Sequence, residues 1–313
     1  MGSDLMPTAM GALGAAPVLT KSRPTTREVF GSKSATTDEQ DALERAFFLR
    51  VVLPNGTFKT TSTDRIDDLN RAVLAHIATI PERPVKIMDV GVSSGVSTLE
   101  WYESLSIENI DCKITATDLT VYASLLSLTP NLAVLIDRNR NILHLDVFGR
   151  GAPPTGRGLQ GLLAGAVRGL FRVAMTADRN LPPLNGHTQE AATGWLLNCE
   201  PVALLTKKLV QHEGLRVVED DLLAMNRPEF IEAFHVLRAA NILNRAYFSD
   251  AVLTQIIKTL KKRLTQNGLL IICRTTEEGV NHATVFRLAT ASEFRVLLRL
   301  GQGSEIEDLV TAT

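Results

Sequence analysis

The chain has 313 residues, 45% of them hydrophobic, and a formal net charge of -1. This composition is typical of a soluble folded protein, and the charge gives no overall reason to expect a nucleic-acid partner. The three cysteines, Cys112, Cys199 and Cys273, are too few and too widely spaced for a disulfide framework or a zinc site. We therefore expect a reducing, cytoplasmic location and no metal.

The start of the chain is rich in Gly, Ala, Pro, Thr and Ser and has little periodic apolar content. This predicts a flexible extension over residues 1–40 and one domain over residues 41–313. No basic stretch precedes a long apolar core in the extension, so no signal peptide is predicted. Residues 63–80 carry apolar side chains at helical spacing and predict a helix that leads into the next strand.

The most informative stretch runs from residue 85 to residue 100. An apolar strand pattern reaches Asp89, a turn of small residues follows through Gly91, Ser93, Ser94 and Gly95, and a helix pattern comes next. This order is typical of the first βα unit of a doubly wound sheet, which binds ligands at the carboxyl ends of its strands. Glycine allows positive φ and close approach of a ligand, and serine hydroxyls near a helix start can bind a polar group. An ordinary βα turn without a ligand is the alternative.

The next strand pattern, residues 110–118, ends on Asp118, 23 positions after Gly95. A carboxylate in this place can accept hydrogen bonds from both hydroxyls of a ribose. The alternative is an aspartate that caps the following helix. The Gly-x-x-x-Gly spacing differs from the Gly-x-Gly-x-x-Gly of dinucleotide-binding proteins, which disfavours a nicotinamide cofactor.

Residues 85–118 resemble motif I and the following acidic strand end of class I S-adenosylmethionine-dependent methyltransferases. The usual motif is Asp/Glu-x-Gly-x-Gly-x-Gly, and Ser93 stands at its middle glycine. The resemblance implies S-adenosyl-L-methionine as the cofactor. The residues that it implies as cofactor ligands are Asp89, Gly91, Ser93, Ser94, Gly95 and Asp118.

Residues 122–200 depart from the alternation of strands and helices. Two apolar runs around a polar turn predict a β-hairpin over residues 133–148, and a helix pattern covers residues 158–175. Residues 149–175 contain four arginines and no acid. The helix can be a lid over a substrate pocket, a peripheral membrane contact, or a core helix with solvated arginines.

The alternation resumes after residue 200. Strand patterns cover residues 215–222, 234–243 and 268–273, a helix pattern covers residues 249–264, and residues 282–298 predict an antiparallel pair. The predicted fold is α/β, with a doubly wound, mostly parallel sheet, an antiparallel last strand, and a hairpin-plus-helix insertion at about 122–200.

Residues 234–272 resemble part of the chemoreceptor glutamate methyltransferases. The matching residues are Arg238, Asn241, Tyr247, Phe248 and Gly268. This resemblance implies that Asn241 lies beside the methionine part of the cofactor, where its amide can donate and accept hydrogen bonds. A strand-end turn residue is the alternative.

Two acids compete for the adenine end of the cofactor. Asp221 resembles the acid beside the adenine in the family, and Asp146 is its rival because it also ends a strand pattern. Capping and solvated charge are the alternative explanation for Asp221. Each histidine is isolated in sequence, so none identifies itself as a general base.

The sequence therefore predicts an S-adenosylmethionine-dependent methyltransferase that acts on an unidentified small-molecule or lipid acceptor. The alternative is a noncatalytic nucleotide-binding or membrane/protein-interaction module on the same fold. The oligomeric state stays open.

Overall fold

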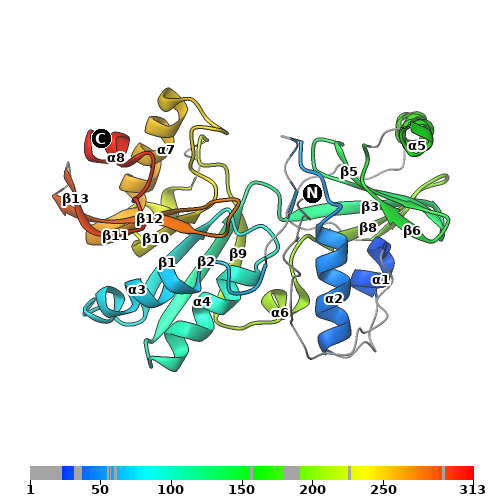
Figure 1. Cartoon of the computed structure of the whole chain (residues 1–313). Coiled ribbons are helices and arrows are strands. Elements are labelled where there is room, and N and C mark those ends of the chain that lie inside the picture. The colour runs from blue at the N-terminus through cyan, green and yellow to red at the C-terminus, as the bar shows by residue number, and fades with distance from the viewer. Residues whose placement is uncertain are drawn as a thin grey trace, which may run out of the picture.

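The computed structural model describes residues 23–313, apart from residues 32–36, 55, 57, 60–61, 156–157, 179–190, 225–226 and 291–292. Its strands form two sheets, which lie in two lobes of the molecule (Figure 1). The first sheet has seven strands in the order β13-β12-β11-β10-β1-β2-β9. These strands are β1 (Val85–Val90), β2 (Cys112–Asp118), β9 (Leu215–Glu219), β10 (Phe234–Ala240), β11 (Leu264–Thr275), β12 (Asn281–Thr290) and β13 (Glu293–Leu300).

This sheet is mostly parallel and Rossmann-like, which confirms the predicted fold. Strands β9, β2, β1, β10 and β11 run parallel, and β12 is the reversed strand, pairing antiparallel with both β11 and β13. The helices of this lobe are α3 (Asp67–Ala78), α4 (Val96–Ile107), α6 (Lys207–Val210), α7 (Asp250–Arg263) and α8 (Glu307–Thr311), with a 3₁₀ turn η1 (Pro228–Phe230).

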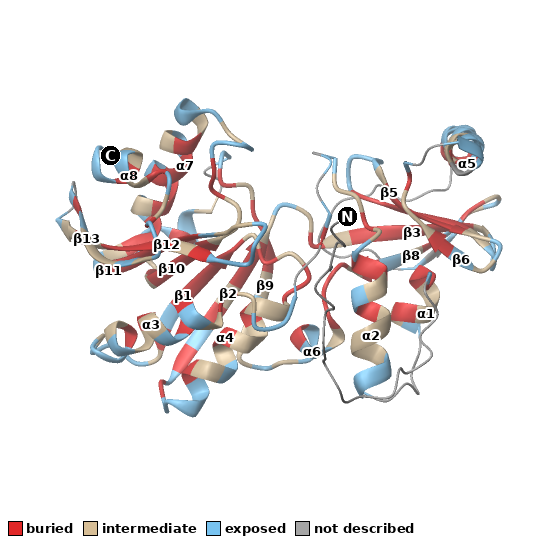
Figure 2. Cartoon of the chain, in the orientation of Figure 1, coloured by how far each residue is buried: buried red, intermediate tan, exposed pale blue. Residues whose placement is uncertain are grey.

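Helices cover both faces of the parallel sheet, because successive strand residues point to opposite faces. Ile87 points to the face packed by α3 and α4, where Trp101 and Leu105 are buried. Its neighbour Met88 points to the other face, which α7 and α8 cover. Figure 2 shows the resulting buried stripe along the central strands. The strands of this sheet are apolar on both faces, which is required because helices cover both faces of a parallel sheet.

The predicted insertion is larger than a hairpin and a helix. It contains a six-stranded antiparallel sheet in the order β6-β5-β4-β3-β8-β7. The hairpin predicted over residues 133–148 is confirmed as the β4–β5 pair. The strands are β3 (Tyr122–Thr129), β4 (Leu132–Ile136), β5 (Ile142–Val147), β6 (Arg150–Ala152), β7 (Ala192–Thr193) and β8 (Asn198–Ala203).

One face of this second sheet packs against α5 (Gly158–Ala177), and the other packs against α1 (Thr26–Gly31) and α2 (Thr37–Phe48). The prediction of a flexible extension over residues 1–40 is wrong for the part of it that is described beyond residue 22. Val29 is buried in α1 against Phe47 and Phe48 of α2. The amino-acid composition does not predict this helix, because its apolar residues are buried only by contact with residues from other parts of the chain. Residues 1–22 lie outside the described residues.

Candidate functional site

The glycine turn joins β1 to α4 through a run of left-handed backbone conformations. Gly91 has φ of 72°, Ser93 of 56° and Gly95 of 90°. A Cβ on Gly91 would lie 2.8 Å from Cδ1 of Ile242, so any other residue would have to adopt a strained positive φ and would also displace the Ile242 side chain. Ser93 has a positive φ, which glycine adopts more easily than serine does. Holding a residue other than glycine in this backbone conformation costs about 1–3 kcal/mol of conformational free energy.

Asp89, at the end of β1, is engaged in a buried ion pair. Arg238 of β10 donates from Nε to Asp89 Oδ1 at 2.9 Å and from Nη2 to Oδ2 at 2.6 Å. Thr98 Oγ1 donates to Asp89 Oδ2 at 2.7 Å. Because both charged side chains are almost fully buried, the pair joins β1, β10 and the first turn of α4. Asp89 and Arg238 thus support the turn.

Asp118, at the end of β2, faces the turn. Its Oδ2 accepts a hydrogen bond from the Ser93 backbone N–H at 2.8 Å. The same oxygen lies 3.3 Å from Nζ of Lys59, whose side chain is fully buried and also donates to the Ser93 carbonyl oxygen at 2.8 Å. Asp118, the acid predicted to hold a ribose, therefore lies beside the turn, and the Lys59 ammonium contacts one of its oxygens.

A cavity of about 60 Å³ lies in front of the turn, lined by Asp89, Gly91, Ser93 and Asn241 among others. Asn241 has φ of 62° and ties β10 to the end of β11. Its Oδ1 accepts from the Thr275 N–H at 2.7 Å, and its Nδ2 donates to Thr275 Oγ1 at 3.1 Å. The structure thus brings together the predicted residues from β1, the turn and β10.

The two candidates for the adenine end lie elsewhere. Asp221 lines neither this cavity nor the larger cavity on the other side of the turn that is described next. Its Oδ1 accepts a hydrogen bond from the Leu223 N–H at 2.9 Å in a tight turn. Asp146 lies in the second sheet, where both its oxygens accept from the Thr26 N–H at the start of α1. The structure thus contradicts the rival placement of Asp146, because residues 122–203 form a separate sheet instead of continuing the parallel one.

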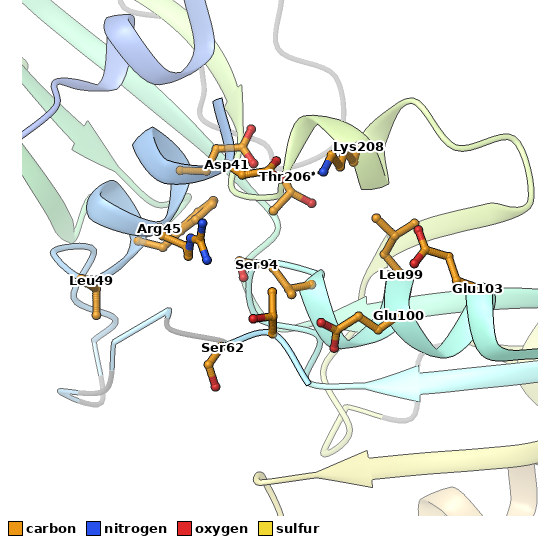
Figure 3. Close-up of a pocket in the computed structure, with 14 residues that line it drawn as sticks. Asp41, Arg45, Leu49, Ser62, Ser94, Leu99, Glu100, Glu103, Thr206 and Lys208 are labelled. Atoms are coloured by element: carbon orange, nitrogen blue, oxygen red, sulfur yellow. Dashed lines mark hydrogen bonds and ion pairs between the residues drawn. The ribbon is translucent and has the colours of Figure 1, made fainter. Parts of the chain in front are cut away.

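A larger cavity of about 430 Å³ lies behind the turn, between α2, α4 and the start of α6 (Figure 3). Ser94 is buried and lines this cavity. Figure 3 shows Arg45 of α2 on one side and Glu100 and Glu103 of α4 on the other. The hydroxyl of Thr206 in the wall has no hydrogen-bond partner within the described part of the chain.

Two carboxyl groups in the wall have perturbed acidity. Burial raises the pKa of Glu44, against the lowering effect of hydrogen bonds from the Lys207 N–H and Gln40. Burial likewise raises the pKa of Glu100, whose Oε1 accepts from the Asp64 N–H at 2.9 Å. Both carboxyl groups therefore hold a proton more readily than an exposed glutamate does.

Lys59, Glu44 and Thr206 are site residues that sequence reasoning missed. Lys59 follows a predicted turn and has no pattern that assigns it to Asp118, since the two are paired only in tertiary structure. Glu44 lies on a helix whose burial depends on the second lobe. Within the described part of the chain, no cluster of His, Cys, Asp and Glu could hold a metal ion.

These residues fit S-adenosyl-L-methionine in chemistry but not in space. A glycine turn and a strand-end carboxylate are the groups that an amino acid and a ribose need. A volume of about 60 Å³ is well below the roughly 300–1,000 Å³ of ligand pockets. The small cavity and the contact of Lys59 with Asp118 both limit the space for such a cofactor in this structure.

No protein-family model and no curated protein matches the sequence. Among solved structures, the chain is similar to the CMeT domain of the citrinin polyketide synthase at 12% identity, over 80% of this chain and 42% of that chain, with a TM-score of 0.35. It is also similar to the CurJ carbon methyltransferase at 13% identity, over 68% of this chain and 35% of that chain, with a TM-score of 0.33. A third similar structure is a SAM-dependent methyltransferase from Methanosarcina mazei, at 14% identity over 63% of this chain and 56% of that chain, with a TM-score of 0.27.

The chain thus spans between about a third and just over half of the length of these three proteins. At these identities the likeness concerns the fold alone.

Proposed function

We propose that the chain binds S-adenosyl-L-methionine at the carboxyl ends of β1, β2 and β10 and transfers a methyl group to a small-molecule or lipid acceptor. One observation carries the proposal. The left-handed turn at Gly91 and Ser93, the Asp118 carboxylate and Asn241 lie at one edge of a parallel sheet. Ligands of doubly wound sheets bind at this edge. The local resemblance of residues 234–272 to chemoreceptor glutamate methyltransferases stays a prediction and gives no acceptor.

When bound, the cofactor supplies an electrophilic methyl group, so the protein's part is chiefly to position two reactants. Asp118 would accept from the ribose hydroxyls, and the turn would lie against the amino-acid part. The segment that contributes Ser62 and Thr63 to the larger cavity also contributes Arg65 and Ile66 to the smaller one. Its withdrawal together with Lys59 would give room for cofactor and acceptor in adjoining spaces.

The direct test is calorimetric titration of the full chain with S-adenosyl-L-methionine and, separately, with NAD. We expect saturable binding of S-adenosyl-L-methionine, loss of binding in Asp118→Asn, and tighter binding in Lys59→Met. The gain in Lys59→Met is expected to be about tenfold or more, since each factor of ten corresponds to about 1.4 kcal/mol. Lys113→Met, which removes an exposed lysine from the same sheet, is the matched control.

A second candidate is a noncatalytic interaction module, which the small volume of the cavity and the contact between Lys59 and Asp118 favour. If neither the wild-type chain nor Lys59→Met binds S-adenosyl-L-methionine while both are folded, the methyltransferase proposal fails and this candidate replaces it. Binding of NAD instead would move the protein to another class of enzyme.

A further inference from the structure

The outward face of α5 is apolar. Five large apolar side chains are exposed on it: Leu159 (83%), Leu162 (73%), Leu163 (48%), Leu170 (48%) and Val173 (67%). At about 100° per residue these positions fall on one side of the helix. A helix on the surface of a soluble protein normally has polar residues on this side. A cluster of exposed apolar residues marks a surface that contacts something else.

This apolar face is not needed to attach α5 to the protein. A different set of residues does that: Ala164, Val167, Phe171, Ala174 and Met175 are buried against the second sheet. Figure 2 shows α5 largely exposed at the outer end of the second lobe, away from the parallel sheet. The outward face is therefore free to meet a large surface.

The charge of the same helix is wholly positive. Helix α5 contains two arginines and no acid, although the whole chain has a net charge of -1. Arg168 and Arg172 lie on α5, and neither forms an ion pair with another described residue. At about 100° per residue the two arginines lie beside the apolar face and not within it, so a surface that covers the apolar face would meet their positive charge at its edge.

An exposed tryptophan lies beside the end of α5. Asp178, directly after the helix, accepts hydrogen bonds at Oδ2 from the N–H groups of Leu196 at 3.2 Å and Leu197 at 2.9 Å. This fixes Trp195, which is 65% exposed, near the last turn of α5. Tryptophan is enriched at the boundary between lipid and water, where its ring is amphipathic.

We propose that α5 docks the protein on an anionic lipid bilayer, lying parallel to the membrane plane with its leucines among the acyl chains. A basic, apolar helix of this kind binds by burying apolar area and by attraction to anionic headgroups. A second copy of the chain is a poorer occupant, because a two-fold contact would place the same acid-free, arginine-bearing helix on both sides. Among the described residues, no helix has the length and apolar character needed to cross a membrane.

The test is cosedimentation of the full chain with vesicles of phosphatidylcholine alone and with about one third phosphatidylserine. We expect binding to the anionic vesicles, weaker binding at high salt, and little binding to the neutral ones. The double variant Leu159→Glu, Leu162→Glu should bind at least about tenfold more weakly, since both side chains are exposed and their burial in lipid is lost. Ile107→Glu, at an exposed apolar position of α4, is the matched control and should bind like the wild type.

Arg168→Gln with Arg172→Gln should weaken binding to anionic vesicles only. Unfolding temperatures of all variants, compared with the wild type, separate lost docking from lost folding. Absence of binding by the folded wild type, or equal binding by the Leu159 and Leu162 variant, would overturn the proposal. A dimer in sedimentation velocity that this variant abolishes, without vesicle binding, would assign the face to a second copy instead.

Discussion

Replacing Arg238 with methionine should destabilise the protein severely. The Arg238 guanidinium is buried between Asp89, the Asn70 side-chain oxygen at 2.9 Å and the Ser97 carbonyl at 3.1 Å, and lies 4.0 Å from the Trp101 ring centroid. Methionine keeps much of the volume and removes every one of these donors. A buried ion pair that loses one partner leaves an uncompensated charge, which costs about 3–5 kcal/mol.

The assay is urea unfolding followed by tryptophan fluorescence, for which buried Trp101 is a reporter. The double variant Arg238→Met, Asp89→Leu removes both charges and should cost less than the sum of the single variants, by about 1–3 kcal/mol. Arg295→Met, which breaks an exposed pair with Glu293, is the control and should show no measurable change. A loss below about 1 kcal/mol in Arg238→Met, or additive single variants, would refute the account of this pair.

Three smaller changes test other parts of the structure. Glu44→Gln should raise stability near neutral pH and make no difference below about pH 4: because burial raises the folded-state pKa of Glu44 above its ordinary value, the wild type loses stability as pH rises through that pKa. Thr25→Ala should cost about 1 kcal/mol by removing the cap of α1, whereas Thr254→Ala, inside α7, should not destabilise. Gly91→Ala should cost more than Gly279→Ala, since both glycines have positive φ but only Gly91 has a side chain within contact distance of its missing Cβ.

Urea unfolding measures all three, at several pH values for Glu44→Gln. A pH-independent difference between wild type and Glu44→Gln would contradict the role of burial at that carboxyl group. Equal losses in the two glycine variants would mean that the dihedral alone, and not the Ile242 contact, explains the glycine. If Thr25→Ala leaves the stability unchanged, the Thr25 cap does not stabilise the helix α1.

The strand, turn and helix around Gly91 could be predicted because their signals are local in sequence. The same holds for the hairpin over β4 and β5. The rest of the second sheet could not, since β3 and β8 pair across the length of the insertion and neither has a turn signal that links them. The α1 helix was missed although Thr25 and Glu28 form the Thr-x-x-Glu capping box, whose hydrogen bonds the structure shows.

The sequence could predict that the candidate residues meet at one edge of the parallel sheet. The ion pairs of Asp89 and Asp118 could not be predicted, because the partners of both carboxylates come from distant parts of the chain. Arg238 and Lys59 reach them only through the fold. A buried cation beside a strand-end acid follows no sequence spacing, so sequence alone could not show that the predicted ribose acid already has a partner.

Residues 122–203 leave and rejoin the parallel sheet at almost one point. The Leu204 N–H donates to the Val121 carbonyl oxygen at 2.7 Å, and Oε1 of Glu219 accepts from the N–H groups of Val121 and Tyr122, both at 2.9 Å. These hydrogen bonds hold the two ends of the segment together beside the paired strands β2 and β9. This junction is therefore a natural point at which residues 122–203 can be exchanged, together with the helices α1 and α2 that pack on their sheet.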